Sequence, residues 1–263
     1  IEDQISEYKD YLSSYFFNFK IKKNNFFTDI SNYISYELGQ PTHCFDEGKV
    51  NGQLVFEKKS LNGAFTTLMD SEIDLEGENC IFSVNEEVIS LAGLMGGMST
   101  ACSESTNIAL IECAYFKPES IIGKSIKYNL QSDAAHKFER GVDPCCHEKV
   151  LRRFINIVQD HVKIKNLEIV KFNNTKFKST EIEIDLDKVN TILGTLIKDD
   201  QYKDNLQKLG FKYDSKIGVP SYRSDVLNQN DLAEEMARII GYNNIPNRTI
   251  NIPNKNQAVI SKK

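Results

Sequence analysis

Residues 131–144 read QSDAAHKFERGVDP, and the rest of the chain is organised around this stretch. Charged and small residues crowd together here without a regular apolar period, although the flanking segments are strongly patterned. Asp143 followed by Pro144 combines a good N-cap residue with a proline suited to the first turn of a helix. We therefore predict a functional site in this stretch and a helix that begins at its end. The apolar face of that helix is Val150, Leu151, Phe154, Ile155 and Val158.

The chain has 263 residues, of which 40% are hydrophobic and 26% charged, as in a soluble globular protein of one or two domains. Its net charge of −5 argues against nucleic-acid binding through bulk charge, although Lys20, Lys22 and Lys23 could form a local basic face. No apolar run approaches the ~20 residues of a membrane span, and the first residues lack a signal-peptide pattern. We therefore expect a cytoplasmic protein with no membrane partner.

The six cysteines show no C-x-x-C pair, and a chain of this size does not need disulfides for stability, so we expect reduced thiols. Cys145 and Cys146 fall in the predicted first helical turn, where the pKa of a thiol can fall. A nucleophilic cysteine is therefore conceivable, but small packing residues are the favoured interpretation.

Two amphipathic helices are expected near the N-terminus. Apolar residues follow helical spacing over residues 5–17 and again from Phe27 to Leu38, after which Gly39 is a C-terminal stop. The expected loop at residues 41–46 holds a histidine among apolar neighbours. Such a histidine is usually a core residue, although its position after a Gly-Gln-Pro break increases the odds of a functional role.

The apolar period changes to two between residues 52 and 114, which predicts strands, with a hairpin turn at Asn85 and Glu86. The segment 93–98 has glycines that would let another backbone or a ligand come close, or would simply form turns. Glu112 lies in an otherwise apolar strand, where an unpaired carboxylate must either reach water or be kept for a partner. The predicted strands are 54–58, 64–68, 80–84, 88–92 and 108–114.

A polar, turn-rich segment at 173–180 predicts a domain boundary after a strand at 162–170. Beyond it, a short strand at 182–184 and three helices that each end at a glycine predict a small winged-helix-like module. The expected fold class is α+β. It comprises a mixed-sheet domain at 1–172, the small module at 173–248 and a tail at 249–263.

Several motifs in the same order resemble the β subunit of bacterial phenylalanyl-tRNA synthetase. They are YELGQPTHCFD at 36–46, LAGLMGG at 91–97, IECAYF at 111–116, SDAAHKFERGVDP at 132–144, VPSYRSD at 219–225 and DLAEEMARIIGY at 231–242. The resemblance covers nearly the whole chain. It implies a B3/B4-like editing domain followed by a small B5-like module, as an internal piece of a longer subunit.

The resemblance implies that the first domain hydrolyses tyrosine wrongly attached to tRNA-Phe. It also implies an α2β2 enzyme in which ATP-dependent ligation belongs to the α subunit, so this piece alone would not ligate. The implied editing pocket comprises His43, Gly96, Gly97, Glu112, Ser132 and Ala134, with Lys22 on the approach side. Two positions depart from the family. Ser132 stands where the family commonly has threonine, and Lys22 stands where it commonly has arginine; lysine keeps the charge but cannot donate the two parallel hydrogen bonds of a guanidinium.

In the implied mechanism, Glu112 accepts the tyrosine hydroxyl, and His43 and Ser132 place the attacking water; whether His43 is a base or only orients the water stays open. The resemblance also implies a Mg²⁺ shared with the α subunit. Its ligands would be Asp225, Asp231, Glu234 and Glu235. A competing interpretation makes Asp231 an N-cap and Glu234 its capping-box partner, because acids suit the first turn of a helix.

Two other functions compete with editing inside a larger enzyme. One is a non-catalytic module that docks tRNA or the partner subunit, with His43 and Glu112 only structural. The other is a free-standing deacylase that acts in trans. The acidic balance of the chain argues against bulk RNA affinity, which weakens the first alternative.

Overall fold

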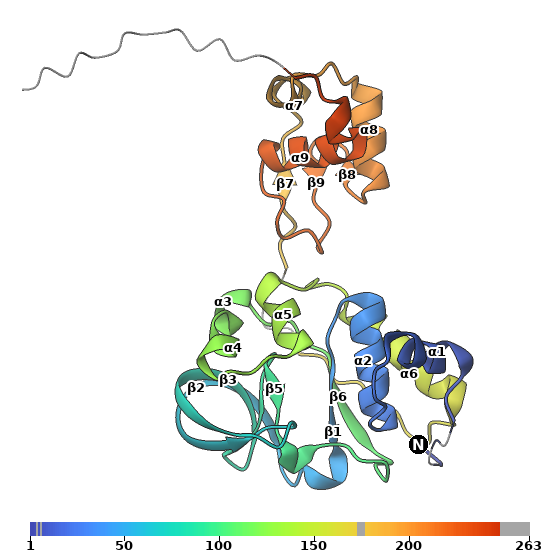
Figure 1. Ribbon diagram of the computed structural model, residues 1–263, viewed down its shortest axis with the longest axis vertical. Coiled ribbons are helices and arrows are strands. Elements are labelled where there is room, and N and C mark those ends of the chain that lie inside the picture. Colours follow the sequence, from blue (N-terminus) through green and yellow to red (C-terminus); the bar gives the residue numbers. More distant parts are fainter. Residues whose placement is uncertain (4, 6, 173–176, 248–263) are drawn as a thin grey trace, which may run out of the picture. The chain divides into compact units, whose positions relative to one another are not determined.

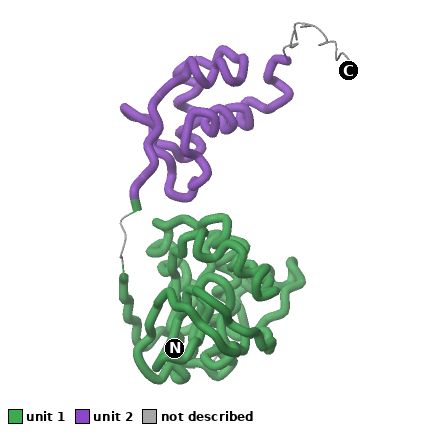
Figure 2. Tube along the Cα trace, turned by 90° about the vertical axis from the view of Figure 1, so that its left-hand side faces the viewer, with its two compact units in different colours: residues 1–177 green, residues 178–263 purple. Residues whose placement is uncertain are grey.

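The computed structural model describes residues 1–3, 5, 7–172 and 177–247. The chain divides into two compact units, residues 1–177 and 178–263 (Figure 2). Each unit has its own hydrophobic core and is described by itself. The predicted tail at 249–263 lies outside the described residues. No helix in the described ranges is long and apolar enough to cross a membrane.

Three helices of the first unit, α1 (Asp10–Phe19), α2 (Phe26–Leu38) and α6 (His147–His161), pack together beside the strands (Figure 1). The side chain of Asn25 caps α2 by accepting a hydrogen bond from the Thr28 N–H, and Gly39 ends the helix in the left-handed conformation, as predicted. α1 begins later than the predicted residue 5. The core between these helices includes Leu12, Phe27, Ile30, Ile34, Val150, Phe154 and Ile157.

A four-stranded sheet is formed by β2 (Leu54–Thr66), β3 (Glu72–Val84), β4 (Glu87–Leu91) and β5 (Met95–Gly96), in that spatial order. Every pairing in it is antiparallel rather than mixed, because consecutive strands are joined by short turns. The predicted hairpin turn is confirmed, with positive φ at both of its central residues. The strands predicted at 54–58 and 64–68 are parts of one long strand, β2.

A second, two-stranded sheet pairs β1 (His43–Asp46) with β6 (Ala109–Glu112). The loop predicted at 41–46 is therefore wrong for residues 43–46, because they pair with a strand more than sixty positions away. The 3-10 turns η1 (Glu47–Lys49) and η2 (Met98–Thr100) lie at the ends of these sheets.

The stretch predicted as an irregular site contains a helix, α5 (Asp133–Arg140), which follows the short helices α3 (Pro118–Ile121) and α4 (Lys124–Lys127). The helix predicted to start at Pro144 starts three residues later, since the Asp143 carboxylate accepts from the Cys145 N–H and closes a turn instead. The predicted strand at 162–170 is wrong, because these described residues pair with no other strand.

The second unit contains β7 (Glu181–Ile182), β8 (Lys212–Tyr213) and β9 (Ile217–Gly218), in the order β7-β9-β8, and all pairings are antiparallel. The helices α7 (Leu186–Leu193), α8 (Asp199–Lys208) and α9 (Gln229–Ile240), followed by η3 (Tyr242–Asn244), pack with this sheet. Its core includes Val189, Tyr202, Leu206, Ile217, Leu232 and Met236. The predicted α+β class is confirmed by this combination of helices and antiparallel sheets.

Candidate active site

The pairing of β1 with β6 places His43 directly opposite Glu112. Cross-strand partners of this kind have Cβ atoms about 4.5–5.5 Å apart, so their side chains share one face of the sheet. Two titratable groups that are separated by 69 positions in the sequence are thereby neighbours. The structure thus brings together the two residues that matter most for the predicted chemistry.

The imidazole of His43 is held in a tight apolar pocket. Its ring packs edge-on against Phe45, with the ring centroids 4.4 Å apart, and a Cβ added to Gly96 would lie 2.4 Å from the imidazole Cε1. Only glycine leaves room for this ring. Burial lowers the pKa of His43 to about 4, so the imidazole is neutral at pH 7.

Glu112 carries a buried oxygen that no described group satisfies. Its Oε1 has no hydrogen-bond partner, and burial raises the pKa of the carboxyl to about 8, although the Ala114 N–H partly offsets this rise. Unsatisfied buried polar atoms are rare in folded proteins because each one costs free energy. An oxygen left in this state is suited to a ligand that brings its own hydrogen-bonding group.

The Ser132 hydroxyl has a structural task. It accepts a hydrogen bond from the Ala135 N–H as the N-cap of α5 and donates one to the Leu94 carbonyl, at 2.7 Å. Serine therefore ties the start of α5 to the glycine-containing segment after β4. Ala134 packs at the edge of the core that contains Phe45.

Gly97 and Lys22 occupy different settings. A Cβ on Gly97 would lie 2.6 Å from the Ile89 carbonyl oxygen, so this glycine permits a close approach of two backbones. Lys22 is exposed in the segment between α1 and α2 and makes no ion pair with any described carboxylate.

The carboxylates of Asp225 and Glu235 converge on Arg223 in the second unit. Asp225 accepts two hydrogen bonds from its guanidinium, and Glu235 accepts one from Arg223 and another from Arg238. These arginines lower the pKa of both carboxyl groups. Helix capping does not account for these two acids. In the structure, their role is to form ion pairs with the two arginines.

The N-cap of α9 is Asn228, not Asp231 as predicted. Asp231 is the third residue of the helix and reaches back to the Asn228 N–H, so the capping box exists but begins three residues earlier. Glu234 is exposed. Among the described residues, no group of three or more Asp, Glu, His or Cys side chains is arranged to hold a metal ion. The four acids as placed here therefore do not fit a Mg²⁺ site within this chain.

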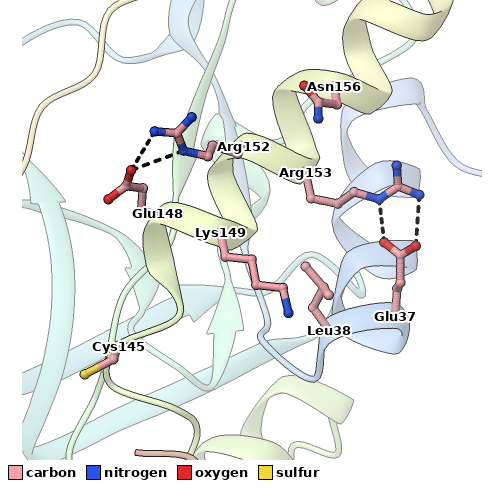
Figure 3. Close-up of a pocket in the computed structure, with 8 residues that line it drawn as sticks. All are labelled: Glu37, Leu38, Cys145, Glu148, Lys149, Arg152, Arg153 and Asn156. Atoms are coloured by element: carbon pink, nitrogen blue, oxygen red, sulfur yellow. Dashed lines mark hydrogen bonds and ion pairs between the residues drawn. The ribbon is translucent and has the colours of Figure 1, made fainter.

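A shallow groove lies between the end of α2 and the first half of α6 (Figure 3). Glu37 accepts two hydrogen bonds from Arg153 across it, and Arg152 pairs with Glu148 along α6. No local pattern predicts the link from Glu37 to Arg153, because the two lie on separate helices. The residues lining this groove include none of those predicted for editing.

The buried and half-buried cysteines favour the packing interpretation, whereas Cys145 is exposed. Cys146 is the N-cap of α6, and burial is the main cause that raises its pKa to about 11, opposite to the fall needed for a nucleophile. All six thiols are free. Cys44 is buried in the core of the first unit.

The sequence matches two domain models. Residues 3–163 match the B3/4 domain, and residues 182–242 match the tRNA synthetase B5 domain. The chain belongs to the B3/4 domain family. Because this domain spans most of the first unit, His43 and Glu112 both lie inside it.

This B3/4 chain is similar to proteins named phenylalanine–tRNA ligase beta subunit. It is 35% identical over 226 residues to that of Pectobacterium atrosepticum, 34% over 225 residues to that of Photorhabdus laumondii and 32% over 234 residues to that of Dickeya dadantii. These alignments cover 83%, 83% and 86% of this chain. They span only 28–29% of the relatives. The predicted resemblance to this subunit is confirmed.

Among solved structures, an N-terminal fragment of the phenylalanyl-tRNA synthetase β-subunit from Pyrococcus horikoshii matches 92% of this chain and 69% of that chain. The TM-score is 0.41 and the sequence identity 14%, values too low to carry an argument.

Proposed function

We propose that the B3/4 unit of this chain hydrolyses tyrosine from wrongly charged tRNA-Phe. One observation carries this proposal: Glu112 keeps a buried oxygen without a partner directly opposite His43. Such an oxygen costs stability unless a ligand satisfies it. A site that persists at that cost is suited to recognising a ligand by a polar group.

The phenol of tyrosine is the group that Glu112 would recognise. Tyrosine differs from phenylalanine only by this hydroxyl, which would form a hydrogen bond with the buried oxygen of Glu112. Phenylalanine would leave the oxygen unsatisfied, and sites of this kind reject the analogue that lacks the hydroxyl by about 10⁴-fold or more. Ala134 is small, which would leave room for the aromatic ring, whereas the space beside Gly96 is taken by the His43 imidazole.

Hydrolysis would use a water molecule held by His43. The oxygen of this water attacks the ester carbonyl carbon, the bond from that carbon to the ribose oxygen breaks, and the ribose oxygen takes up the proton that the water loses, which gives free tyrosine and a ribose hydroxyl. The low pKa of His43 makes its imidazole a weak base at pH 7, so we assign it the role of orienting the water through a neutral ring nitrogen. Ser132 would support the site by fixing α5 rather than by touching the water.

The wider role follows from the relatives and is also a proposal. The chain would act in a phenylalanine–tRNA ligase with an α subunit and tRNA-Phe in the cytoplasm, and ATP-dependent ligation would occur outside it. Mg²⁺ shared with the α subunit at Asp225, Asp231, Glu234 and Glu235 stays a prediction about the assembled enzyme. In the described chain, Asp225 and Glu235 are already bound by Arg223.

The test is hydrolysis of tyrosyl-tRNA-Phe and phenylalanyl-tRNA-Phe by this chain and by the assembled enzyme. We expect the tyrosyl ester to be hydrolysed much faster than the phenylalanyl ester. Glu112→Ala in the assembled enzyme should lose tyrosyl hydrolysis while phenylalanine ligation continues. Equal rates for both esters, or unchanged tyrosyl hydrolysis in the variant, would contradict the proposal and favour a docking module.

A further inference from the structure

The ladder between β1 and β6 stops at the editing residues. Its last pair is His43 with Glu112, and two residues further along the same register would place Pro41 opposite Ala114. Neither Pro41 nor Ala114 is part of a strand. Proline has no N–H, so Pro41 cannot donate a hydrogen bond across to the other segment. The end of the ladder therefore needs a donor from elsewhere.

The side chain of Gln40 joins the two segments at this point. Gln40 is only 1% exposed, and its Nε2 donates hydrogen bonds to the Pro41 carbonyl and to the Ala114 carbonyl, both at 2.9 Å. A side-chain amide has two N–H donors, and both are used here. Gln40 thereby supplies the donor that Pro41 lacks.

The surroundings fix the orientation of the Gln40 amide. Its Oε1 accepts a hydrogen bond from the Cys146 thiol, with the sulfur 3.4 Å away. The opposite orientation would direct this oxygen at two carbonyl oxygens, neither of which can donate. A buried polar group with all of its partners is rigid, so the backbone that it binds is held with it.

The residue that Gln40 binds also acts on Glu112. The Ala114 N–H lowers the pKa of the Glu112 carboxyl group, against the larger rise that burial causes. Gln40 holds the carbonyl of this same residue. On the other segment, Pro41 lies two residues before His43. One side chain therefore fixes the backbone beside both Glu112 and His43.

We propose that Gln40 is a positioning residue for the editing site, which holds the Glu112 carboxyl group where a tyrosine hydroxyl is recognised. This assignment rests on the editing function proposed above. A hydrogen bond from a phenol to the unpartnered oxygen of Glu112 needs a distance of about 2.5–3.0 Å, so a small displacement of the carboxyl group weakens it. Gln40 acts through Ala114 and does not touch the substrate.

The first test replaces Gln40 by methionine, which has a similar length but no N–H donor. In the assembled enzyme, the preference for hydrolysing tyrosyl-tRNA-Phe over phenylalanyl-tRNA-Phe should fall about 10-fold, the effect of one misplaced hydrogen bond. Gln40→Asn keeps the amide on a shorter side chain, so its preference should fall only about 3-fold. An unchanged preference in Gln40→Met, or in Gln40→Asn if the methionine variant does not fold, would overturn the proposal.

The matched control is Asn79→Leu. Asn79 is 3% exposed in β3, and its Nδ2 donates to the Glu76 and Gly77 carbonyls at 3.4 and 3.0 Å. This variant also deprives two carbonyls of a buried amide, so its melting temperature should fall as in Gln40→Met. Its tyrosine preference should match that of the unmodified enzyme. Equal falls of the preference in both variants would overturn the proposal.

A second readout does not depend on hydrolysis. Nuclear magnetic resonance of ¹³C-labelled glutamate carboxyl groups in the 263-residue chain measures the pKa of Glu112, whose signal is identified by its loss in Glu112→Gln. Three titratable neighbours stay neutral from pH 5 to pH 9. Burial lowers the pKa of His43 to about 4 and raises the pKa of the Cys44 and Cys113 thiols.

Gln40→Met should raise the pKa of Glu112 further above 8, because the Ala114 N–H is then no longer held in place. Asn79→Leu should leave this pKa unchanged. A pKa of Glu112 that moves equally in both variants, or in neither, would contradict the positioning role.

Editing and positioning can fail separately. If the unmodified enzyme hydrolyses both esters equally, editing is contradicted, while a raised pKa of Glu112 in Gln40→Met would still support the hold of Gln40 on the carboxyl group. Selective hydrolysis whose preference and Glu112 pKa are both unchanged in Gln40→Met would overturn the positioning role and leave editing standing.

Discussion

Glu112 and Glu235 are two glutamates whose buried carboxyl oxygens are treated in opposite ways. Glu235 receives hydrogen bonds from Arg223 and Arg238, and its pKa is lowered. Glu112 has an unpartnered Oε1, and its pKa is raised to about 8. The arginines give the Glu235 carboxylate a structural role, whereas the unpartnered oxygen of Glu112 is suited to a ligand that supplies a hydrogen-bonding group. From the sequence, a functional role is expected for both glutamates.

The largest effect should come from removing the partner of Glu235. Arg223→Met would leave a buried carboxylate with only Arg238, and breaking a buried ion pair in this way costs about 3 kcal/mol of unfolding free energy. Urea unfolding of the chain measures the loss. The matched control is Arg152→Met, whose partner Glu148 is exposed and which should cost less than about 0.5 kcal/mol.

If Arg223→Met and Arg152→Met had equal costs, the carboxylates of the second unit would not be a structural network. Glu235 would then no longer be an example of a buried carboxylate with a structural role, and a ligand role for Asp225 and Glu235 would gain support.

The pH dependence of the unfolding free energy should show the cost of burying the Glu112 carboxyl group without a partner for Oε1. The Glu112 carboxyl group of the folded chain keeps its proton up to a pKa of about 8, while an unfolded chain loses it near the ordinary pKa of 4.5. The folded state therefore loses stability as the pH rises between these values. Glu112→Gln removes this loss, so the stability of the variant relative to the unmodified chain should grow by roughly 3 kcal/mol from pH 5 to pH 8 in urea unfolding. A constant difference across this range would show that Glu112 is not desolvated.

A smaller effect of opposite sign should come from His43. Its folded pKa of about 4 lies below the ordinary value of 6.5, so the unfolded chain binds a proton first as the pH falls. Stability should be lost between pH 6.5 and pH 4, and His43→Gln should lack roughly 2 kcal/mol of that loss. Thermal melts at pH 7 and pH 4.5 measure it. Parallel losses in both proteins would contradict the burial of His43.

Local signals in the sequence predicted much of the fold. Gly39 ends α2, Gly194 ends α7, and the turn at Asn85 and Glu86 forms a hairpin, because each rests on backbone conformations that few residues adopt. The motifs also located His43 and Glu112. Their face-to-face pairing was not predictable, since the strand at residues 43–46 is stabilised only by a partner far along the chain.

The start of α9 shows a different limit. Asn228 with Asp231 and Asp231 with Glu234 both have the spacing of a capping box, so the sequence pattern alone fits two registers. The structure has the earlier of these two helix starts. The helix that begins there buries Gln229, Leu232 and Met236. Likewise, Arg223 is the partner of Glu235 only once the chain has folded.

The most direct measurement of the central claim compares Glu112→Gln with Glu235→Gln in the same chain. Both changes replace one carboxyl group by an amide at nearly constant volume. We predict that Glu112→Gln loses the preference for tyrosyl-tRNA-Phe over phenylalanyl-tRNA-Phe at unchanged or higher stability, and that Glu235→Gln keeps the preference at lower stability. A Glu112→Gln variant that retains the preference would contradict the account.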